Sequence, residues 1–357
     1  MKKNSDNYYQ ERNLINLDKI DRLLEDLPFF CEDYLRGVET RTSTLTRLNY
    51  CYDLRIFFDF LSKRKFHGKK EVRDITLEDL ESITSTDIEI YLSYLSNYRY
   101  GDRRLSCDEK AKARKLSTVR ALFKYFFNKG LIEVNNTAKV TTPKIHDKEI
   151  IRLEGSEISS IIDTAESGRG LTGHAKGYHE QTKVRDTAIL TLFLGTGIRI
   201  SELVGLDNES IDFTNNSFIV TRKGGNKAIL YFSDEVADAL QSYMRQKKDD
   251  PAIPKEEHAL FLSLQKKRIT VRAVENLVKK YAKIVSPLKK ITPHKLRSTY
   301  GTALYRETGD IYIVADVLGH KDVNTTRKHY AAITEDKRRA VAGKVKLHKP
   351  VDDDDDE

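Results

Sequence analysis

Helical periodicity occupies roughly the first 140 residues, and this pattern constrains the fold more than any other feature. Apolar residues recur at the three- and four-residue spacing of one helix face at Tyr50, Leu54, Phe57, Phe58 and Leu61. Further helices are predicted over residues 87–98 and 112–128. A helix with one apolar stripe must bury that stripe against another element. The first part of the chain is therefore predicted to be a helical domain.

The helical pattern stops at residues 135–146, which we interpret as a linker. Pro143 disfavours the helical conformation at the residue before it. Beyond the linker, strands are predicted over residues 217–221 and 228–232, joined as a hairpin, with a third strand over 259–263. Helices then continue to about residue 342. At 357 residues the chain is too long for one typical core, so we expect a mainly α fold with a small antiparallel β-sheet in two domains.

Positive charge is concentrated in the body of the chain. The net charge is +8, and the last six residues, 352–357, are all acidic, so the preceding residues carry +14. A basic body of this size is what binding to a phosphate backbone requires, although basic surfaces also occur on proteins that are merely soluble. The acidic tail, taken as residues 348–357, is predicted to be disordered.

The densest positive charge lies over residues 101–130, which hold nine Lys or Arg and three acidic residues. The predicted helix over 112–128 is aromatic on one side and basic on the other. Such a helix is typical of a face that contacts DNA; the alternative is an ordinary solvated face. The candidate DNA contacts of this region are Arg103, Arg104, Lys112, Arg114, Lys115, Arg120 and Lys124.

Cysteine and histidine usage gives no sign of a metal or a cofactor. The three cysteines, Cys31, Cys51 and Cys107, lie in the first third without paired spacing, which fits a reducing cytoplasm and argues against disulfides or a zinc site. His174 and His179 lie in a glycine-rich stretch predicted to be a flexible surface loop. A run of about 18 apolar residues and a signal-peptide pattern are both missing. We expect a cytoplasmic, nucleoid-associated protein, not bound to a membrane, that needs no metal and no cofactor.

Six residues in the second half of the chain stand in short phrases that fit phosphate chemistry. Arginine can hold a phosphodiester in two hydrogen bonds, a phenol can attack it, and Lys or His can move protons. Together these groups are sufficient to cut and rejoin a DNA strand without a metal. In chain order they are Arg199 in Thr-Gly-Ile-Arg-Ile-Ser-Glu, Lys223 in Thr-Arg-Lys-Gly-Gly, His294 and Arg297 in Pro-His-Lys-Leu-Arg, His320 in Leu-Gly-His, and Tyr330 in Thr-Thr-Arg-Lys-His-Tyr.

Spacing predicts how the cationic groups are presented. His294 and Arg297 share one helix face if Pro293 opens a helix. Glu202, three residues after Arg199, would orient a neighbouring cation or histidine without itself touching the phosphate. An acidic residue at this spacing from an arginine is also a routine surface arrangement.

The nucleophile is predicted to be Tyr330. A free phenol has a pKa of about 10 and needs a proton acceptor at neutral pH, for which His294 is the first candidate. Gly319 predicts a helix end from which His320 is presented. His320 would then hydrogen-bond the scissile phosphate.

The leaving 5′ oxygen needs a proton, and Lys223 is the candidate donor. It lies at the turn of the predicted hairpin, from which a lysine can reach over a bound strand. Arg222 and Lys227 are the alternatives for this role. Arg222, Lys227 and Lys295 are also candidate DNA contacts.

Taken in order, these phrases resemble those of the tyrosine recombinases, the phage-integrase and Xer-type site-specific recombinases. The resemblance covers roughly residues 20–343 and is closest to the Xer-like single recombinases and integrases of Gram-positive bacteria, through Arg-Asp-Thr-Ala-Ile-Leu from Arg185, Thr-Arg-Lys-Gly-Gly from Thr221 and Thr-Pro-His-Lys-Leu-Arg from Thr292. One departure is that Tyr330 follows His320 by ten residues, where many members have nine.

The resemblance implies a two-domain, C-shaped clamp around duplex DNA. The catalytic domain would include a C-terminal segment, residues 337–347, that docks on a neighbouring protomer. The expected divisions are an N-terminal extension over residues 1–18, a helical core-binding domain that binds DNA over 19–140, a linker over 141–152, a mixed α/β catalytic domain over 153–347 and the acidic tail over 348–357.

The resemblance also implies a site-specific DNA recombinase that works through a 3′-phosphotyrosine and a Holliday junction, without metal or ATP. Expected partners are double-stranded DNA with an inverted-repeat site and further copies of the chain in a homotetramer; a DNA translocase or an accessory DNA-bending protein is a further candidate. Chromosome-dimer resolution, DNA inversion and mobile-element integration or excision share this chemistry. The alternatives are a type IB topoisomerase-like enzyme and a catalytically idle DNA-binding relative.

Overall fold

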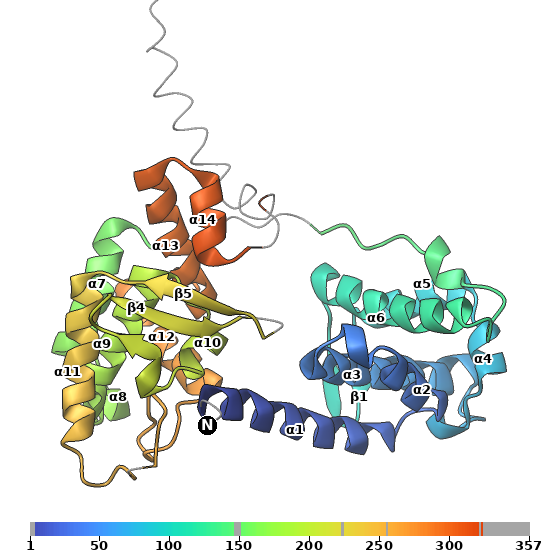
Figure 1. Cartoon of the computed structure of the whole chain (residues 1–357). Helices are drawn as coiled ribbons and strands as arrows, with labels where there is room; N and C mark the ends of the chain where they lie inside the picture. Colours follow the sequence, from blue (N-terminus) through green and yellow to red (C-terminus); the bar gives the residue numbers. More distant parts are fainter. Residues whose placement is uncertain (1–3, 146–150, 223–224, 255, 321–322, 324–357) are drawn as a thin grey trace, which may run out of the picture. The chain divides into compact units, whose positions relative to one another are not determined.

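The computed structural model describes residues 4–145, 151–222, 225–254, 256–320 and 323. The chain divides into two compact units, residues 1–148 and 149–357 (Figure 1). Helices predominate in both, and the strands are short and antiparallel, so the predicted fold class is confirmed. Among the described residues, no helix is long and apolar enough to cross a membrane.

The first unit is helical, with one two-stranded sheet. Its elements are α1 (Asn4–Leu24), α2 (Phe30–Gly37), η1 (Glu39–Arg41), α3 (Thr44–Phe60), η2 (Leu61–Lys65), η3 (Val72–Asp74), α4 (Leu77–Glu81), α5 (Ser85–Tyr94), β1 (Tyr98–Tyr100), β2 (Arg103–Leu105), α6 (Glu109–Asn128) and η4 (Asn136–Lys139).

The core of this unit is built on α3, which packs against α1 and α6. The apolar stripe predicted from the sequence is the buried face of this helix: Leu54, Phe57 and Phe58 are inaccessible to solvent, and Leu61 follows them at the start of η2. Burial of these three large side chains of α3, each worth about 1.5–3 kcal/mol, makes α3 the central element of the unit.

One predicted helix of this unit is too long at its C-terminal end. We expected a helix over residues 87–98, whereas α5 ends at Tyr94 and Tyr98 begins a hairpin. At its N-terminus, Thr84 and Asp87 form a reciprocal capping box with N–H···O distances of 2.9 and 3.2 Å. The β1–β2 hairpin turns at Gly101, whose positive φ of 56° suits glycine. Alternating Tyr and Arg beside a Gly-Asp pair was the sequence signal for it.

The second unit places helices around a three-stranded sheet (Figure 1). Its elements are α7 (Gly155–Ser167), α8 (Gly173–Gly177), α9 (His179–Thr196), α10 (Ile200–Val204), η5 (Asn208–Ser210), β3 (Ile211–Asp212), β4 (Ser217–Thr221), β5 (Lys227–Tyr231), α11 (Asp234–Lys248), α12 (Val271–Val285), α13 (Pro293–Thr308) and α14 (Ile311–Leu318).

The helix α9 is the centre of the second unit, in contact with α7, α11 and α13. The sheet has the order β3-β4-β5, and the predicted hairpin pairs Val220 with Ala228. The strand expected over residues 259–263 is wrong: those residues make single bridges, Asp207 to Ala259 and Leu262 to Arg268, and the third strand is β3. A two-residue strand is too short to give an alternating pattern in the sequence.

The glycine-rich stretch that contains His174 and His179 is not the flexible surface loop that we expected. Residues 173–177 form α8, and His179 is the first residue of α9. The His179 side chain is buried, with Nε2 2.8 Å from the Ala165 carbonyl oxygen. The imidazole therefore ties the start of α9 to the end of α7.

Candidate active site

Three separate segments of the second unit meet at the C-terminal end of α14. The guanidinium of Arg199 donates to the carbonyl oxygens of Leu318 at 3.0 Å and Gly319 at 2.8 Å. The guanidinium of Arg297 donates to the Leu318 carbonyl as well. Two predicted phosphate-binding arginines, one just before α10 and the other on α13, therefore converge on one oxygen atom.

Arg199 is positioned by a sharp turn at the end of α9. Gly197 ends this helix with φ 62°, and a Cβ there would lie 2.5 Å from the Tyr300 ring, so only glycine fits. Arg199 then caps α10, where Glu202 accepts from its backbone N–H at 3.0 Å and from its Nη1 at 2.8 Å. Glu202 is 3% exposed and the Arg199 side chain 34%. A buried carboxylate thus orients a guanidinium that solvent can reach.

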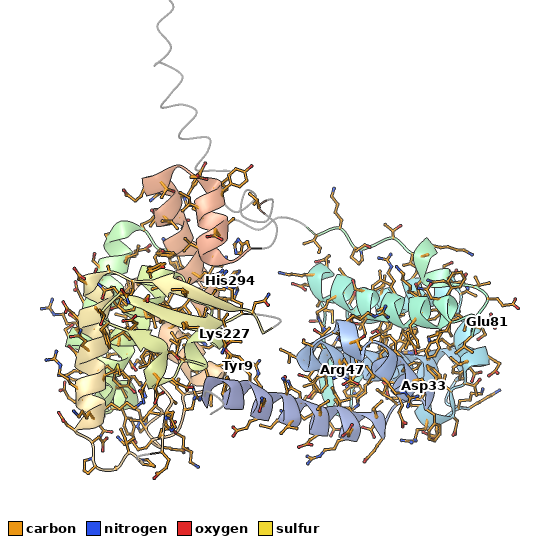
Figure 2. All side chains as sticks on the ribbon, in the orientation of Figure 1. Tyr9, Asp33, Arg47, Glu81, Lys227 and His294 are labelled. Carbon is orange, nitrogen blue, oxygen red and sulfur yellow. The ribbon has the colours of Figure 1, made fainter. Side chains whose placement is uncertain are left out.

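Arg297 lies deeper than Arg199. Pro293 is the first residue of α13 and Arg297 is in the second turn, 5% exposed, where its Nη1 also donates to the Gly197 carbonyl at 2.5 Å. His294, on the first turn of the same helix, is exposed (Figure 2). Buried guanidinium groups need several acceptors, and the carbonyls of two helix ends supply them here.

His320 follows a glycine-terminated helix, as predicted. Gly319 ends α14 in the left-handed conformation, φ 60°, and the His320 backbone N–H donates to the Ala315 carbonyl at 2.9 Å. The last carbonyls of a helix carry its partial negative charge and attract cations. This electrostatic attraction gathers the arginines beside His320.

Two members of the predicted set, Lys223 and Tyr330, lie outside the described residues, as does the segment 337–347. Two nearby candidates are described: Arg222 follows β4, and Lys227 begins β5 (Figure 2). Lys295, a candidate DNA contact, is half-buried on α13. The sequence did not predict that the backbone carbonyls of Leu318 and Gly319 accept hydrogen bonds from the arginines, because no side chain marks them.

Only some cations of the predicted basic face of the first unit are exposed to solvent. Arg103, Arg104, Arg114 and Lys124 are exposed, on β2 and α6. Lys112 is half-buried and donates to Ser96 Oγ at 2.7 Å. The predicted contacts that stay exposed are therefore those of the β1–β2 hairpin, together with Arg114 and Lys124 on α6.

Lys115 and Arg120 are engaged inside the protein; Arg114 also pairs with the buried Asp53, although 54% of its side chain stays exposed. Lys115 is 5% exposed, and its Nζ donates to Asp53 Oδ1 at 2.9 Å. Arg120 donates to the carbonyls of Thr137 and Val140 and to Thr142 Oγ1. Both side chains hold the protein's own segments together, so we leave them out of the proposed DNA-contacting set. Among the described residues, no group of three His, Cys, Asp or Glu is arranged to hold a metal.

Residues 152–337 match the phage integrase family, and residues 32–130 match the N-terminal SAM-like domain of phage integrases. The first match spans more than half of the chain, which therefore belongs to the phage integrase family.

Curated relatives agree with this membership. The chain is 31% identical over 307 residues to the tyrosine recombinase XerC of Caldanaerobacter subterraneus, covering 83% of this chain and 80% of that protein. It is 28% identical over 350 residues to the tyrosine recombinase XerS of Streptococcus agalactiae, covering 91% and 98%. The chain is thus a tyrosine recombinase of the Xer type, an enzyme of site-specific DNA recombination.

Solved structures share the fold at low sequence identity. The XerH recombinase bound to its palindromic difH substrate, in a post-cleavage complex, has a TM-score of 0.67 at 15% identity, covering 92% of this chain and 89% of that one. The Tn1549 transposon integrase in complex with circular-intermediate DNA has a TM-score of 0.61 at 21% identity, covering 87% and 98%.

Proposed function

We propose that this recombinase cuts and rejoins each strand of double-stranded DNA through Tyr330. The phenolic oxygen forms a bond to the scissile phosphorus, the bond to the 5′ oxygen breaks, and a 3′-phosphotyrosine is left. His294 accepts the phenolic proton and Lys223 donates a proton to the 5′ oxygen. The reverse sequence, with a new 5′ hydroxyl, rejoins the strand, so the energy of the broken bond is conserved and ATP is unnecessary.

The convergence of Arg199 and Arg297 on the Leu318 carbonyl is the observation that carries this proposal. Phosphoryl transfer places added negative charge on the non-bridging oxygens, which must be neutralised by a metal or by fixed cations. Guanidinium stays charged at any working pH and offers five N–H donors. Two guanidinium groups close enough to share one oxygen are close enough to share one phosphate.

The neighbouring groups fit supporting roles. Glu202 would keep the Arg199 guanidinium oriented while it binds phosphate, because its carboxylate holds both the backbone and the side chain. His320, beside the last turn of α14, would donate a hydrogen bond to a non-bridging oxygen. Neither role requires a metal ion.

The DNA interface of the first unit would use the cations that the structure leaves exposed. These are Arg103 and Arg104 on the hairpin and Arg114 and Lys124 on α6. In the second unit, Lys227 and Lys295 are the corresponding candidates; Arg222 is left out because its guanidinium donates to the Val317 carbonyl within the protein. Contacts of this kind position a protein on the phosphate backbone, while base contacts and DNA shape select the site.

We further propose that four copies assemble on two duplexes that each carry an inverted-repeat site. Each copy supplies one Tyr330 and two duplexes present four strands to cut, so four nucleophiles are needed. The solved complex of XerH with a palindromic substrate supports a two-fold symmetric site. Closed cyclic assemblies require a docking element on each protomer, and the segment 337–347 is our candidate.

The decisive experiment uses a nicked suicide substrate that traps the covalent intermediate. Wild-type protein should form a protein–DNA adduct on denaturing gels, and Tyr330→Phe should bind the same DNA with near-normal affinity and form none. Tyr312→Phe, which alters an exposed tyrosine of α14, serves as the control. An adduct that survives in Tyr330→Phe would overturn the assignment of the nucleophile.

A second experiment separates recombination from the alternatives. A plasmid that carries two target sites should yield recombined products with wild-type protein. Relaxation of supercoils without recombined products would indicate a type IB topoisomerase-like activity. Binding without either product would indicate a catalytically idle relative.

A further inference from the structure

Arg222 joins the hairpin of the second unit to the C-terminal end of α14. Its Nη2 donates to the Val317 carbonyl at 3.1 Å. The next two carbonyls along the chain accept from Arg199 and Arg297. Three consecutive carbonyls, those of residues 317–319, are therefore held by three arginines that come from three different segments.

The contact between Arg222 and α14 depends on a missing side chain. Gly319 has φ 60°, and a Cβ built there would lie 2.1 Å from Nη1 and 2.4 Å from Cζ of Arg222. Real Cβ atoms never approach other atoms so closely. The guanidinium thus occupies the space that glycine leaves, directly before His320 in the chain.

The backbone of Arg222 closes the hairpin loop. Its N–H donates to the Asn226 carbonyl at 2.7 Å, and its carbonyl accepts from the Gly225 N–H at 3.0 Å. Lys223 is the next residue in the chain. One residue therefore fixes the base of the loop that carries Lys223 and, through its side chain, binds the helix end that carries His320.

This arrangement is not explained by stability alone. Guanidinium groups gathered at one helix end repel one another, although the partial negative charge of the helix terminus offsets part of that repulsion. In addition, Nε of Arg222 is buried without a hydrogen-bond acceptor among the described residues. An unpaired buried donor is unfavourable, so this placement of Arg222 carries a cost in stability.

We propose that Arg222 is a positioning residue for Lys223: because Arg222 binds both Asn226 at the base of the hairpin turn and Val317 at the end of α14, it determines where the next residue in the chain can donate its proton. This inference rests on the proposed role of Lys223 as the proton donor to the leaving 5′ oxygen. Arg222 itself touches neither the phosphate nor the leaving group. Its loss should therefore weaken proton donation specifically, and leave charge stabilisation by the arginine pair in place.

The test compares two suicide substrates, one with the natural 5′ oxygen and one with sulfur at the 5′ bridging position. A thiolate leaves without a proton, so any defect in proton donation disappears on the sulfur substrate. Single-turnover cleavage rates would be measured for Arg222→Met, Arg222→Lys, Lys223→Ala and the double variant Arg222→Met/Lys223→Ala. Arg199→Ala serves as a comparison, because it removes charge stabilisation and leaves the proton donor in place.

Arg268→Met is the matched control for the loss of a partly buried arginine. Arg268 donates to the Val204 and Leu206 carbonyls at 2.9 Å and pairs with Asp207, in the same unit but not at α14. Melting temperatures of all variants would show any loss of stability. A merely structural effect, such as that of Arg268→Met, should not depend on which atom leaves.

On the natural substrate, Arg222→Met should cleave about 10- to 100-fold more slowly than wild type, the size of effect that a misplaced catalytic group produces. On the sulfur substrate it should regain most of that loss, as Lys223→Ala does, while Arg199→Ala does not. The double variant should be no slower than Lys223→Ala alone. Arg222→Lys should remain impaired, because an ammonium cannot reproduce the planar contact with Gly319.

Three results would overturn the inference. The first is a defect in Arg222→Met of equal size on both substrates, which would mark a structural role. The second is a double variant that cleaves more slowly than Lys223→Ala, by the factor that Arg222→Met alone produces. The third is rescue of Arg222→Met without rescue of Lys223→Ala, which would make Arg222 the proton donor. Failure of the proposed reaction would be seen separately, as wild-type protein that forms no adduct on either substrate.

Discussion

Arg199 and Arg297 bind the same atom, the carbonyl oxygen of Leu318, although one precedes α10 and the other lies on α13. The shared acceptor fixes the distance between the two guanidinium groups before any DNA is bound. Preorganised charge of this kind lowers a barrier because nothing needs to move as the transition state forms. The arginines also differ: Arg199 is partly exposed, and Arg297 is buried against two helix ends.

Strand cleavage should persist in excess EDTA, because the two arginines supply the positive charge that a metal would supply. Arg199→Ala should slow cleavage about 10²-fold or more, comparable with the loss of one preorganised donor. It should also lower the melting temperature, because the buried Glu202 carboxylate loses its ion-pair partner. Arg297→Ala should slow cleavage and also lower the melting temperature, because it leaves the carbonyls of Gly197 and Leu318 without their buried partner. Cleavage abolished by EDTA and restored by magnesium would contradict this mechanism.

Lys124 and Lys115 lie on the same helix, and only Lys124 should contact DNA. Lys124→Met should weaken binding and reduce the slope of log K against log salt concentration by about 1, the signature of one lost phosphate contact. Lys115→Met should leave that slope unchanged and reduce the free energy of unfolding by ~1–3 kcal/mol, because Asp53 loses a buried partner. Fluorescence anisotropy across a salt series, with urea unfolding, measures both. Equal slope changes in Lys124→Met and Lys115→Met would show that burial does not keep Lys115 from contacting DNA.

The close packing of Gly168 against the His179 ring should affect stability but not the cleavage rate. Gly168 has φ 71°, and a Cβ there would lie 2.7 Å from the His179 ring. Gly173 also has a positive φ, 54°, but nothing lies within 4 Å of its Cβ position. Gly168→Ala should therefore lower the free energy of unfolding by more than Gly173→Ala, whose cost is the backbone strain of about 1–2 kcal/mol. Equal losses in urea unfolding would place His179 away from Gly168, and neither change should affect the cleavage rate.

Glu157 should make stability depend on acid pH. Partial burial raises the pKa of its carboxyl, but hydrogen bonds from Lys289 Nζ, Ser286 Oγ and the Glu154 backbone outweigh burial and lower the pKa to about 2 from its usual 4.5. A carboxylate with a lowered folded-state pKa stabilises the protein above the unfolded-state pKa, and this contribution is lost as pH falls through the folded value. The melting temperature of Glu157→Gln should lie below that of wild type by a constant amount from pH 7 to 5.

Below about pH 4.5 the difference between Glu157→Gln and wild type should shrink. The Glu157 carboxyl of the unfolded chain becomes protonated in this range, while that of the folded protein stays ionised. Asp163→Asn, at an exposed position on the same helix, should show no comparable pH-dependent difference. A difference that is unchanged down to pH 3 would show that the carboxylate is not held by Lys289 as the structure has it.

The sequence alone determined the local structure well where a short pattern carries it. The buried stripe of α3 follows from residue spacing, and the β4–β5 hairpin follows from two runs of β-forming residues around a glycine turn. The start of α13 at Pro293 and the end of α14 at Gly319 follow from the stereochemistry of those two residues. Each of these depends on neighbours within a few positions, which is why the sequence is sufficient.

Only the tertiary structure decided which charged groups work together. In the sequence, Lys115 is one of several cations on a basic helix. In the structure it is buried, because its partner is Asp53, 62 residues away. His179 reads as part of a loop, and it is buried because the end of α7 lies against it. The five ordered phrases predicted the candidate chemistry, but the meeting of Arg199, Arg222 and Arg297 on three successive carbonyls required α9, α13, α14 and the hairpin to pack together. Hydrogen bonds between segments that are about a hundred residues apart depend on that packing, and no local pattern records it.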